Sequence, residues 1–354
     1  MGQSVAVFGA YGHTGRFVVT ELRARGFVPL LLGRDAEKLR ALAASHPGLE
    51  HLVTSVDDPA SLDQALQGAA AVVNSAGPFA STAAPIIEAA LRAGIPYVDV
   101  AAEIEANLDT FTHFADRAEA AGVAVVPAMA FFGGLGDLLV TTAMGDWTAA
   151  DEAHVAYGLS SWHPTAGTLA SGTVSRERRD GRRVRYTGGR LEYYVAEGDL
   201  PTLDWDFPAP VGRRRVLGEF TMADVVTVPS HLSIPEVRTY MTTDAATDLA
   251  AAGAPTAVDA LGRSAQTFTV DVVVRCGDTR RRVVASGQDI YAVSAPLAVE
   301  AVRRILAGRT RTSGVASAGK MFDAPDFLRA LSAHLNTRSP SGVATAVNPP
   351  APAH

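Results

Sequence analysis

Val5-Ala-Val-Phe8-Gly9-Ala-Tyr-Gly12-His-Thr-Gly15 is the stretch that decides the fold, because an apolar run passes directly into closely spaced glycines and then into a helical pattern. A second apolar run, Val28 to Leu32, follows and ends in Gly33-Arg34-Asp35. This order predicts a βαβ unit with glycines at its first strand-to-helix turn. The pyrophosphate of a dinucleotide approaches bare backbone at such a turn, so the opening predicts a dinucleotide-binding domain.

The three glycines of this turn have separate expected roles. Gly9 would allow the sharp turn, Gly12 would let phosphate oxygens reach backbone N–H groups, and Gly15 would let helix and strand pack closely. The intervening residues predicted to contact the same ligand are Tyr11, His13 and Thr14. The spacing is G-x-x-G-x-x-G instead of G-x-G-x-x-G, and the alternative is a glycine-rich turn without a ligand.

The end of the second strand indicates which dinucleotide is bound. Asp or Glu there binds the ribose 2′-hydroxyl of NAD, whereas a nearby Arg holds the 2′-phosphate of NADP. The strand ends at Gly33 and the next side chain is Arg34, whose guanidinium can grip a phosphate with paired hydrogen bonds. Asp35 could act as the acidic residue one position late, but it also suits the N-cap of a helix over 36–44. We therefore predict NADP, with NAD as the alternative.

Composition narrows the class of protein. The chain has 354 residues, which favours two domains, and 47% of them are hydrophobic, which is ample for a sizeable core. The net charge of -6 gives no general attraction to nucleic acid or to an anionic membrane. The single cysteine, Cys276, excludes an internal disulfide and a multi-thiolate metal site, and no metal is expected. With no signal peptide before the first strand and no apolar run long enough to span a bilayer, we expect a cytoplasmic protein.

Strands and helices continue to alternate after the opening unit. Further strands are predicted over 53–56, 70–74, 96–100 and 123–127, with helices over 61–66, 83–93 and 107–121. This alternation predicts an α/β fold with a parallel, doubly wound sheet, in which ligands bind at the carboxyl ends of the strands.

Two of these strand ends carry candidate cofactor contacts. Asp57 follows the predicted strand over 53–56, where it could accept a hydrogen bond from the adenine amino group or cap a helix. The predicted strand over 70–74 is followed by the small residues Ser75, Ala76, Gly77 and Pro78. They would let the nicotinamide ribose lie against backbone, although the segment could also be a plain strand-to-helix turn.

After residue 150 the pattern changes to short alternating segments. They lie at 152–159, 173–178, 182–186, 215–220, 267–275 and 281–288, and Asp180-Gly181 between two of them is a hairpin signal. We predict that they form the antiparallel sheet of a second domain. Helical patterns return at 296–306 and 327–335, and the Pro-, Ala- and Ser-rich end, 337–354, is predicted to be a disordered tail.

One pair of predicted strands bears on assembly. Over 267–288 the alternation gives a wholly apolar face, formed by Phe268, Val270, Val272 and Val274, and a mixed face, formed by Thr267, Thr269, Asp271 and Val273. The apolar face should pack on helices of its own domain. The mixed face and the strand edges beside it are predicted to form a symmetric homodimer, because exposed sheet edges tend to be paired or covered.

Three segments together resemble the saccharopine dehydrogenase-like oxidoreductases. They are Gly9 to Gly15, Asn74-Ser-Ala-Gly-Pro-Phe79, and Ala93-Gly-Ile-Pro-Tyr-Val-Asp99 with Glu103. In addition, Gly167-Thr-Leu-Ala-Ser171 is similar to an element of the branch that contains trans-acting enoyl reductases. The resemblance implies a split Rossmann domain, 1–150 plus 289–336, with an α+β domain for substrate binding and dimerisation inserted over 151–288. It also implies NAD(P)-dependent hydride transfer to a C=N, C=O or C=C bond.

One loop departs from that family. The family often has Gly-Phe-Asp-x-x-Pro-Ser-Asp after the strand that ends here at Pro127. This chain has Ala130-Phe-Phe-Gly-Gly-Leu-Gly-Asp137, so only the final aspartate matches. The loop faces the nicotinamide in the family, and its substrate contacts therefore do not transfer.

Catalytic groups are harder to identify than cofactor contacts. Asp99 and Glu103 are predicted to lie near the hydride site and to orient substrate or relay a proton, although two acids four residues apart also suit a solvated helix start. His163, in Trp162-His163-Pro164, is a third candidate because histidine titrates near neutral pH, and its alternative is a loop histidine in water. The Tyr-x-x-x-Lys pairing of short-chain dehydrogenases is absent from the sequence.

Substrate contacts are assigned to three aromatic residues, Phe131, Phe132 and Trp162, with plain core packing as the alternative for the two phenylalanines. The arginine-rich stretch 176–185 could hold substrate carboxylates, but its alternation fits a solvated strand face. Three functions stay open for a small-molecule substrate bound between the domains. They are an enoyl or carbonyl reductase, an imine-reducing amino acid dehydrogenase, and a catalytically silent NADPH-binding sensor.

Overall fold

A computed structural model describes residues 2–195, 198–249 and 253–339. Its first sheet contains β1 (Ser4–Phe8), β2 (Val28–Gly33), β3 (His51–Val53), β4 (Ala71–Asn74), β5 (Tyr97–Asp99), β6 (Ala124–Val126) and β15 (Gly314–Val315). Their order is β15-β6-β5-β4-β1-β2-β3, and every neighbouring pair is parallel. The predicted parallel, doubly wound sheet is therefore confirmed.

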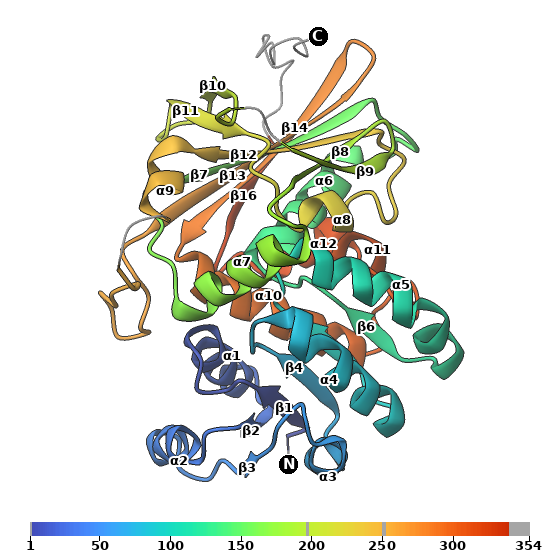
Figure 1. Cartoon of the computed structure of the whole chain (residues 1–354), viewed down its shortest axis with the longest axis vertical. Coiled ribbons are helices and arrows are strands. Elements are labelled where there is room, and N and C mark those ends of the chain that lie inside the picture. Colours follow the sequence, from blue (N-terminus) through green and yellow to red (C-terminus); the bar gives the residue numbers. More distant parts are fainter. Residues whose placement is uncertain (1, 196–197, 250–252, 340–354) are drawn as a thin grey trace.

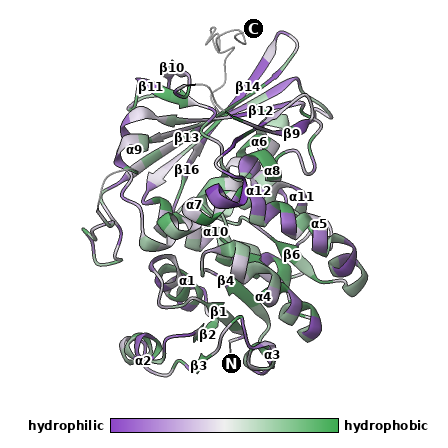
Figure 2. Ribbon diagram, viewed as in Figure 1, coloured by the Kyte–Doolittle hydropathy of each residue, from purple (hydrophilic) through white to green (hydrophobic). Residues whose placement is uncertain are grey.

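Helices cover both faces of this sheet (Figure 1). On one face, α1 (His13–Ala24), α2 (Ala36–Ser45) and α10 (Ile290–Leu306) share a core with inward residues such as Val5 and Val7. On the other, α3 (Pro59–Leu66), α4 (Phe79–Ala93) and α5 (Ile104–Ala121) pack on Ala6 and Phe8. Figure 2 shows the same division, with hydrophobic colouring on β4 and β6 and hydrophilic segments on α5. The alternation of buried side chains on β1 thus holds a helical layer on each side.

Over the residues that the structure describes, the second sheet has nine strands. Along its main path, in spatial order, lie β10 (Thr202–Asp206), β11 (Arg213–Gly218), β12 (Glu236–Thr242), β7 (Glu152–Leu159), β13 (Thr267–Cys276), β14 (Thr279–Gln288) and β16 (Asn336–Arg338). The hairpin of β8 (Arg183–Thr187) and β9 (Arg190–Tyr194) joins β12. All pairs are antiparallel except β12 with β7.

Shorter elements connect the two sheets. A kinked turn (Phe131–Leu135), with non-helical backbone at Phe132 and Gly133, leads into α6 (Gly136–Met144), which packs on β13 and β14. The helix α7 (Ala166–Arg178) follows β7 and packs against α4 and α5. The remaining short helices are α8 (Asp224–Thr227), α9 (Thr243–Asp248), α11 (Ala318–Met321) and α12 (Ala324–Ala330).

The prediction of a strand over 173–178 is wrong, because these residues form the second half of α7. Thr165 caps the helix by accepting a hydrogen bond from the Thr168 N–H, and this start signal lies well before the β-branched residues that suggested a strand. Asp180 and Gly181, with φ +53° and +71°, turn α7 into β8 and do not join two strands. Positive φ suits a helix end as well as a hairpin, so the dipeptide alone does not distinguish them.

Helix starts were also predicted too late. The helix predicted from residue 83 begins at Phe79, and the one predicted from Pro296 begins at Ile290, so Pro85 and Pro296 both lie inside helices. At the other end, the disordered tail predicted from Thr337 is wrong for Thr337 and Arg338, which pair with β14. The rest of that prediction, over 340–354, lies outside the described residues.

The two faces of the 267–288 strands differ in how the chain covers them. Phe268, Val270, Val272 and Val274 are buried in the main core, which confirms the predicted apolar face. On the mixed face Thr269 and Asp271 are also buried, and Trp205 Nε1 donates a hydrogen bond to Asp271 at 2.9 Å. Part of the predicted dimer face is therefore already covered within one chain.

Candidate functional site

The backbone at the first strand-to-helix turn is bare and tightly packed. Gly9 has φ +80°, which L side chains rarely adopt, and a Cβ on it would lie 2.8 Å from Ala76 Cβ. A Cβ on Gly15 would lie 2.2 Å from the Gly9 carbonyl oxygen, so α1 can approach β1 only without a side chain there. Packing alone therefore accounts for these two glycines.

Gly12 is different, because the fold does not require glycine there. It precedes α1 with φ −65°, and an added Cβ would meet only the Gly9 carbonyl oxygen, at 3.1 Å. The first turn of α1 has no side-chain cap and no acidic residue, so its N–H groups are available to an anion. The turn therefore fits a dinucleotide pyrophosphate, and Thr14 lies half-buried in the same helical turn.

His13 begins α1 and faces the C-terminal part of the domain. Its ring makes edge contacts with Phe17 at 5.4 Å and Tyr291 at 5.2 Å between centroids. Burial lowers the pKa of His13, and its Nε2 has no hydrogen-bond partner in the described part of the chain. The imidazole is therefore neutral near pH 7 with a ring nitrogen open beside the turn.

The end of β2 forms the candidate site for the adenosine ribose. A Cβ on Gly33 would lie 2.5 Å from the ring of Tyr11, so Tyr11 packs directly on this strand end. The Lys38 ammonium lies 5.7 Å from the centre of the Tyr11 ring. Arg34 is exposed, and its side chain makes no hydrogen bond or ion pair within the residues that the structure describes. One cation, Lys38, thus lies over Tyr11 and another, Arg34, follows the strand end on which Tyr11 packs, and sequence reasoning missed Lys38.

Asp35 has the structural role that its position suggested. Its carboxylate accepts hydrogen bonds from the N–H groups of Glu37 and Lys38, at 3.1 and 3.0 Å, and so caps α2. The backbone hydrogen bond from Lys38 is the main reason that the pKa of Asp35 is lowered. With both oxygens engaged by the helix start and by the Lys38 ammonium at 3.2 Å, Asp35 does not replace Arg34 as the ribose reader.

Asp57 and Ser75 lie at the ends of neighbouring segments. Asp57 is exposed, and within the described part of the chain its carboxylate accepts a hydrogen bond only from Ser55. The cap of α3 is instead Asp58, which accepts from the Ser61 N–H. Asp57 therefore stays available as an adenine contact. Ser75 Oγ donates to the Phe8 carbonyl oxygen at 2.9 Å and ties the end of β4 to the glycine turn.

Asp99 lies in a buried network that fixes three strand ends. Its Oδ1 accepts hydrogen bonds from the N–H groups of Ala101 and Ala128, at 3.0 and 2.8 Å, and its Oδ2 accepts from Tyr97 at 2.9 Å. Asn74 donates to the same tyrosine at 3.1 Å. Asp99 is 1% exposed, and burial raises its pKa to about 6. This geometry fits a residue that positions the turns after β4, β5 and β6 better than one that touches substrate.

Asp99→Asn tests this positioning role through pH. Asparagine mimics the protonated acid, keeps an acceptor for the two N–H groups and can donate to Tyr97. Because the folded pKa of about 6 exceeds the unfolded value of about 3.9, ionisation costs the native protein stability as pH rises through this range. Relative to wild type, the variant should gain up to about 3 kcal/mol between pH 4 and pH 7 in denaturant unfolding. A lost turnover with unchanged stability and NADPH affinity would instead indicate a proton relay.

Glu103 also has a structural role. Its two carboxylate oxygens accept hydrogen bonds from the Phe79 and Ala80 N–H groups, at 2.7 and 3.0 Å, and so cap α4 from the neighbouring segment. The residue is 5% exposed. The solvated helix start considered for Glu103 is wrong, and the geometry holds the Gly77–Pro78 turn in place instead of aiming an acid at substrate.

Helix α7 lies over the turn that precedes α4. A Cβ on Gly77 would lie 2.5 Å from Ser171 Oγ, so the helix approaches this backbone closely. Tyr291 joins the start of α7 to α10, because its hydroxyl lies 3.0 Å from Thr168 Oγ1 and accepts from Trp162 Nε1 at 3.2 Å. Figure 1 shows α7 between the two sheets, beside α10. The Gly-Thr-x-x-Ser segment thus covers the predicted nicotinamide end of the site.

The predicted substrate aromatics are brought together, but in a core. The ring of Phe132 lies 4.9 Å from Phe131 and 5.2 Å from Trp162, and all three are at most 6% exposed. Phe132 also packs on Tyr157, whose hydroxyl donates to both oxygens of Asp224 at 2.8 Å. The core alternative therefore describes Phe131 and Phe132 better than an open pocket does.

His163, the third predicted catalytic residue, lies on the surface, whereas Asp137 is buried. His163 is exposed on the loop before α7, with no hydrogen bond or ion pair among the described residues, as a loop histidine in water would be. Asp137, the matching aspartate of the altered loop, is buried and accepts from the Gly319 N–H and from His231, both at 2.7 Å. Both oxygens of Asp137 thus hold α6 to neighbouring segments.

No group of three or more His, Cys, Asp or Glu side chains in 2–195, 198–249 and 253–339 could hold a metal ion. Among the helices described there, none is both long enough and apolar enough to cross a membrane.

Comparison with known proteins finds a family match for the N-terminal part of the chain. Residues 5–126 match the family model of the saccharopine dehydrogenase NADP binding domain. A saccharopine dehydrogenase-like oxidoreductase of Bos taurus is 27% identical over 145 residues, which are 36% of this chain and 34% of the relative. The Homo sapiens protein of that name is 31% identical over 117 residues, 28% of this chain and 27% of its own. The chain thus matches about a third of the length of these relatives.

A solved structure extends the likeness to the whole fold. The saccharopine dehydrogenase (L-Glu forming) of Saccharomyces cerevisiae superimposes with a TM-score of 0.64, over 96% of this chain and 100% of that one. At 13% sequence identity the match shows the fold alone. A relative from Arabidopsis thaliana, 29% identical over 142 residues covering 36% of this chain and 31% of its own, is named a probable mitochondrial saccharopine dehydrogenase-like oxidoreductase.

Proposed function

We propose that the protein is an NADP-dependent reductase, on the premise that its residues 5–126 match the family model of the saccharopine dehydrogenase NADP binding domain. Its substrate is a small molecule with a C=C, C=O or C=N bond, bound between the two domains. The observation that carries the proposal is the bare turn at Gly12, which leads into the uncapped start of α1 and would let a dinucleotide pyrophosphate lie against backbone N–H groups.

Each part of the cofactor has a candidate partner. Backbone N–H groups at the start of α1 would hold the pyrophosphate, and Arg34 with Lys38 would hold the 2′-phosphate. The small residues 75–78, fixed by Asn74 and Glu103, would support the nicotinamide ribose. Bound NADPH supplies a hydride at its nicotinamide ring.

The surroundings of Gly77 favour an uncharged substrate. The groups placed there are the Ser171 hydroxyl and, beyond it, the Thr168, Tyr291 and Trp162 cluster. Within the described residues, this cluster makes hydrogen bonds and ring contacts with hydroxyl, carboxylate, imidazole and aromatic groups. None of these contacts involves a guanidinium group. An enoyl or carbonyl reductase is therefore favoured over an amino acid dehydrogenase, which needs arginines aimed at substrate carboxylates.

A substrate panel tests this function. Oxidation of NADPH is followed by absorbance with an enoyl thioester, an aldehyde, a cyclic imine and a 2-oxo acid with ammonia. We expect turnover with one of the first three. Turnover only with the oxo acid and ammonia would support the amino acid dehydrogenase, and tight NADPH binding with no turnover of any substrate would support the sensor.

The proposal extends to assembly and location. We propose a homodimer through the second sheet, with its outer strands β10 and β16 as the available edges, because much of the mixed face is already covered. The cytoplasm remains the proposed location, although one relative is named as mitochondrial.

A further inference from the structure

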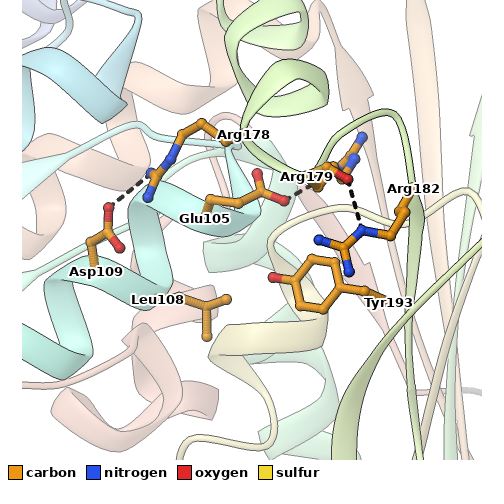
Figure 3. Close-up of a pocket in the computed structure, with 7 residues that line it drawn as sticks. All are labelled: Glu105, Leu108, Asp109, Arg178, Arg179, Arg182 and Tyr193. Carbon is orange, nitrogen blue, oxygen red and sulfur yellow. Dashed lines mark hydrogen bonds and ion pairs between the residues drawn. The ribbon is translucent and has the colours of Figure 1, made fainter.

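A pocket of about 220 Å³ lies at the C-terminal end of α7 (Figure 3). Its lining residues are Glu105, Leu108, Asp109, Arg178, Arg179, Arg182 and Tyr193. They come from α5, the end of α7 and β9, so two domains contribute to one small cavity. The proposed reductase function uses none of these residues.

Charge in the pocket is only partly balanced. Arg178 pairs with Asp109 at 2.8 Å, and Arg179 pairs with Glu105 at 3.3 Å. The third guanidinium, that of Arg182, pairs with the Asp180 carboxylate at 3.4 Å. The Asp180 side chain is 84% exposed, so water screens this ion pair. With both lining acids ionised, the three arginines leave the pocket with one positive charge in excess.

Open hydrogen-bond donors accompany this charge. Arg179 Nε is buried and has no partner in the described part of the chain. Arg182 lies over the ring of Tyr193, 5.6 Å from its centre, and Figure 3 shows the two side chains next to each other on the wall facing Glu105. Burial raises the pKa of the Tyr193 hydroxyl, so this group stays protonated and can donate. A buried donor without an acceptor is costly, and a bound oxyanion would satisfy it.

We propose that this pocket binds a small oxyanion, a carboxylate or a phosphate, through Arg182, Arg179 Nε and the Tyr193 hydroxyl. The ligand would link the end of α7 to β9, because Arg179 is the C-cap of α7 and Tyr193 lies on β9. Ser171, which covers Gly77, lies seven residues before Arg178, about 10 Å along the same helix. Binding would therefore hold the helix that covers the predicted nicotinamide end of the site.

Calorimetric titration of the cofactor-free full chain tests the proposal, with inorganic phosphate and succinate as separate probes. We expect saturable binding of at least one, and the preferred probe identifies the ligand class. Arg182→Ala should weaken binding by about tenfold or more, because a charge-assisted contact is lost. Tyr193→Phe should weaken it about threefold. The matched control is Arg214→Ala, which removes the same charge from the exposed face of β11.

Hydrogen exchange locates the bound anion, and slower exchange at the end of α7 and in β9 is expected with wild type only. Three results would overturn the proposal: no saturable binding of either probe, equal binding to Arg182→Ala and wild type, or protection confined to other segments. Because these measurements contain no cofactor, their failure would leave the proposed reductase function untouched.

Discussion

Gly12→Val is expected to abolish NADPH binding and to leave the protein folded. The Gly12 φ of −65° suits valine, and the nearest atom to an added Cβ is the Gly9 carbonyl oxygen at 3.1 Å, which needs to shift by only a few tenths of an ångström. The branched side chain would, however, occupy the space through which pyrophosphate oxygens reach the first N–H groups of α1. Loss of two such charge-assisted hydrogen bonds weakens binding by more than about a hundredfold.

Fluorescence titration with NADPH measures the loss of cofactor binding, and a thermal melt measures whether the variant is still folded. Gly253→Val is the matched control, since its φ is not positive and its added Cβ has an ordinary 3.6 Å contact with His163. That control should melt cooperatively and bind NADPH as wild type does. Wild-type NADPH affinity in Gly12→Val would show that the turn at Gly12 does not bind the pyrophosphate.

Arg34→Ala is expected to weaken NADPH binding by about ten- to a hundredfold and to leave NADH binding nearly unchanged. The exposed Arg34 guanidinium follows the end of β2, where the ribose 2′ position of a dinucleotide lies in this fold. The effect is selective because only NADPH carries the phosphate that the guanidinium would hold. Lys38 near Tyr11 would retain part of the attraction, so the loss is finite.

Calorimetry with both cofactors measures the selectivity of Arg34. Arg40→Ala is the control, because Arg40 is an exposed arginine on α2 and its loss changes the net charge equally. Arg40→Ala should reduce NADPH affinity by no more than about twofold, because salt screens the long-range attraction between an exposed charge and the cofactor. An equal loss for NADPH and NADH in Arg34→Ala would show that Arg34 does not read the phosphate.

The nucleotide-binding half could be predicted from sequence because its signals are local. Gly9, with positive φ, and Gly15, with no room for a Cβ, are dictated by the turn itself. Asp35 caps α2 through N–H groups two and three residues away. In each case the partners lie within a few residues or on the adjacent strand, so a spacing pattern records them.

The acids could not be interpreted in the same way, because long-range contacts decide their roles. Asp99 receives a hydrogen bond from the Ala128 N–H, 29 positions later, and Glu103 caps a helix that begins 24 positions earlier. Spacing placed both acids near the strand ends but could not reveal that their oxygens are already occupied. Ser175 similarly bonds Glu105 across 70 positions, which helps to fix as a helix a stretch whose local pattern suggested a strand.

Calorimetric titration of the unmodified chain with NADPH and with NADH tests the central claim most directly. The account predicts saturable, one-site binding of NADPH and at least tenfold weaker binding of NADH, with about tenfold marking the low end of a charge-assisted phosphate contact. Equal affinity for both, or no binding of either, would contradict it.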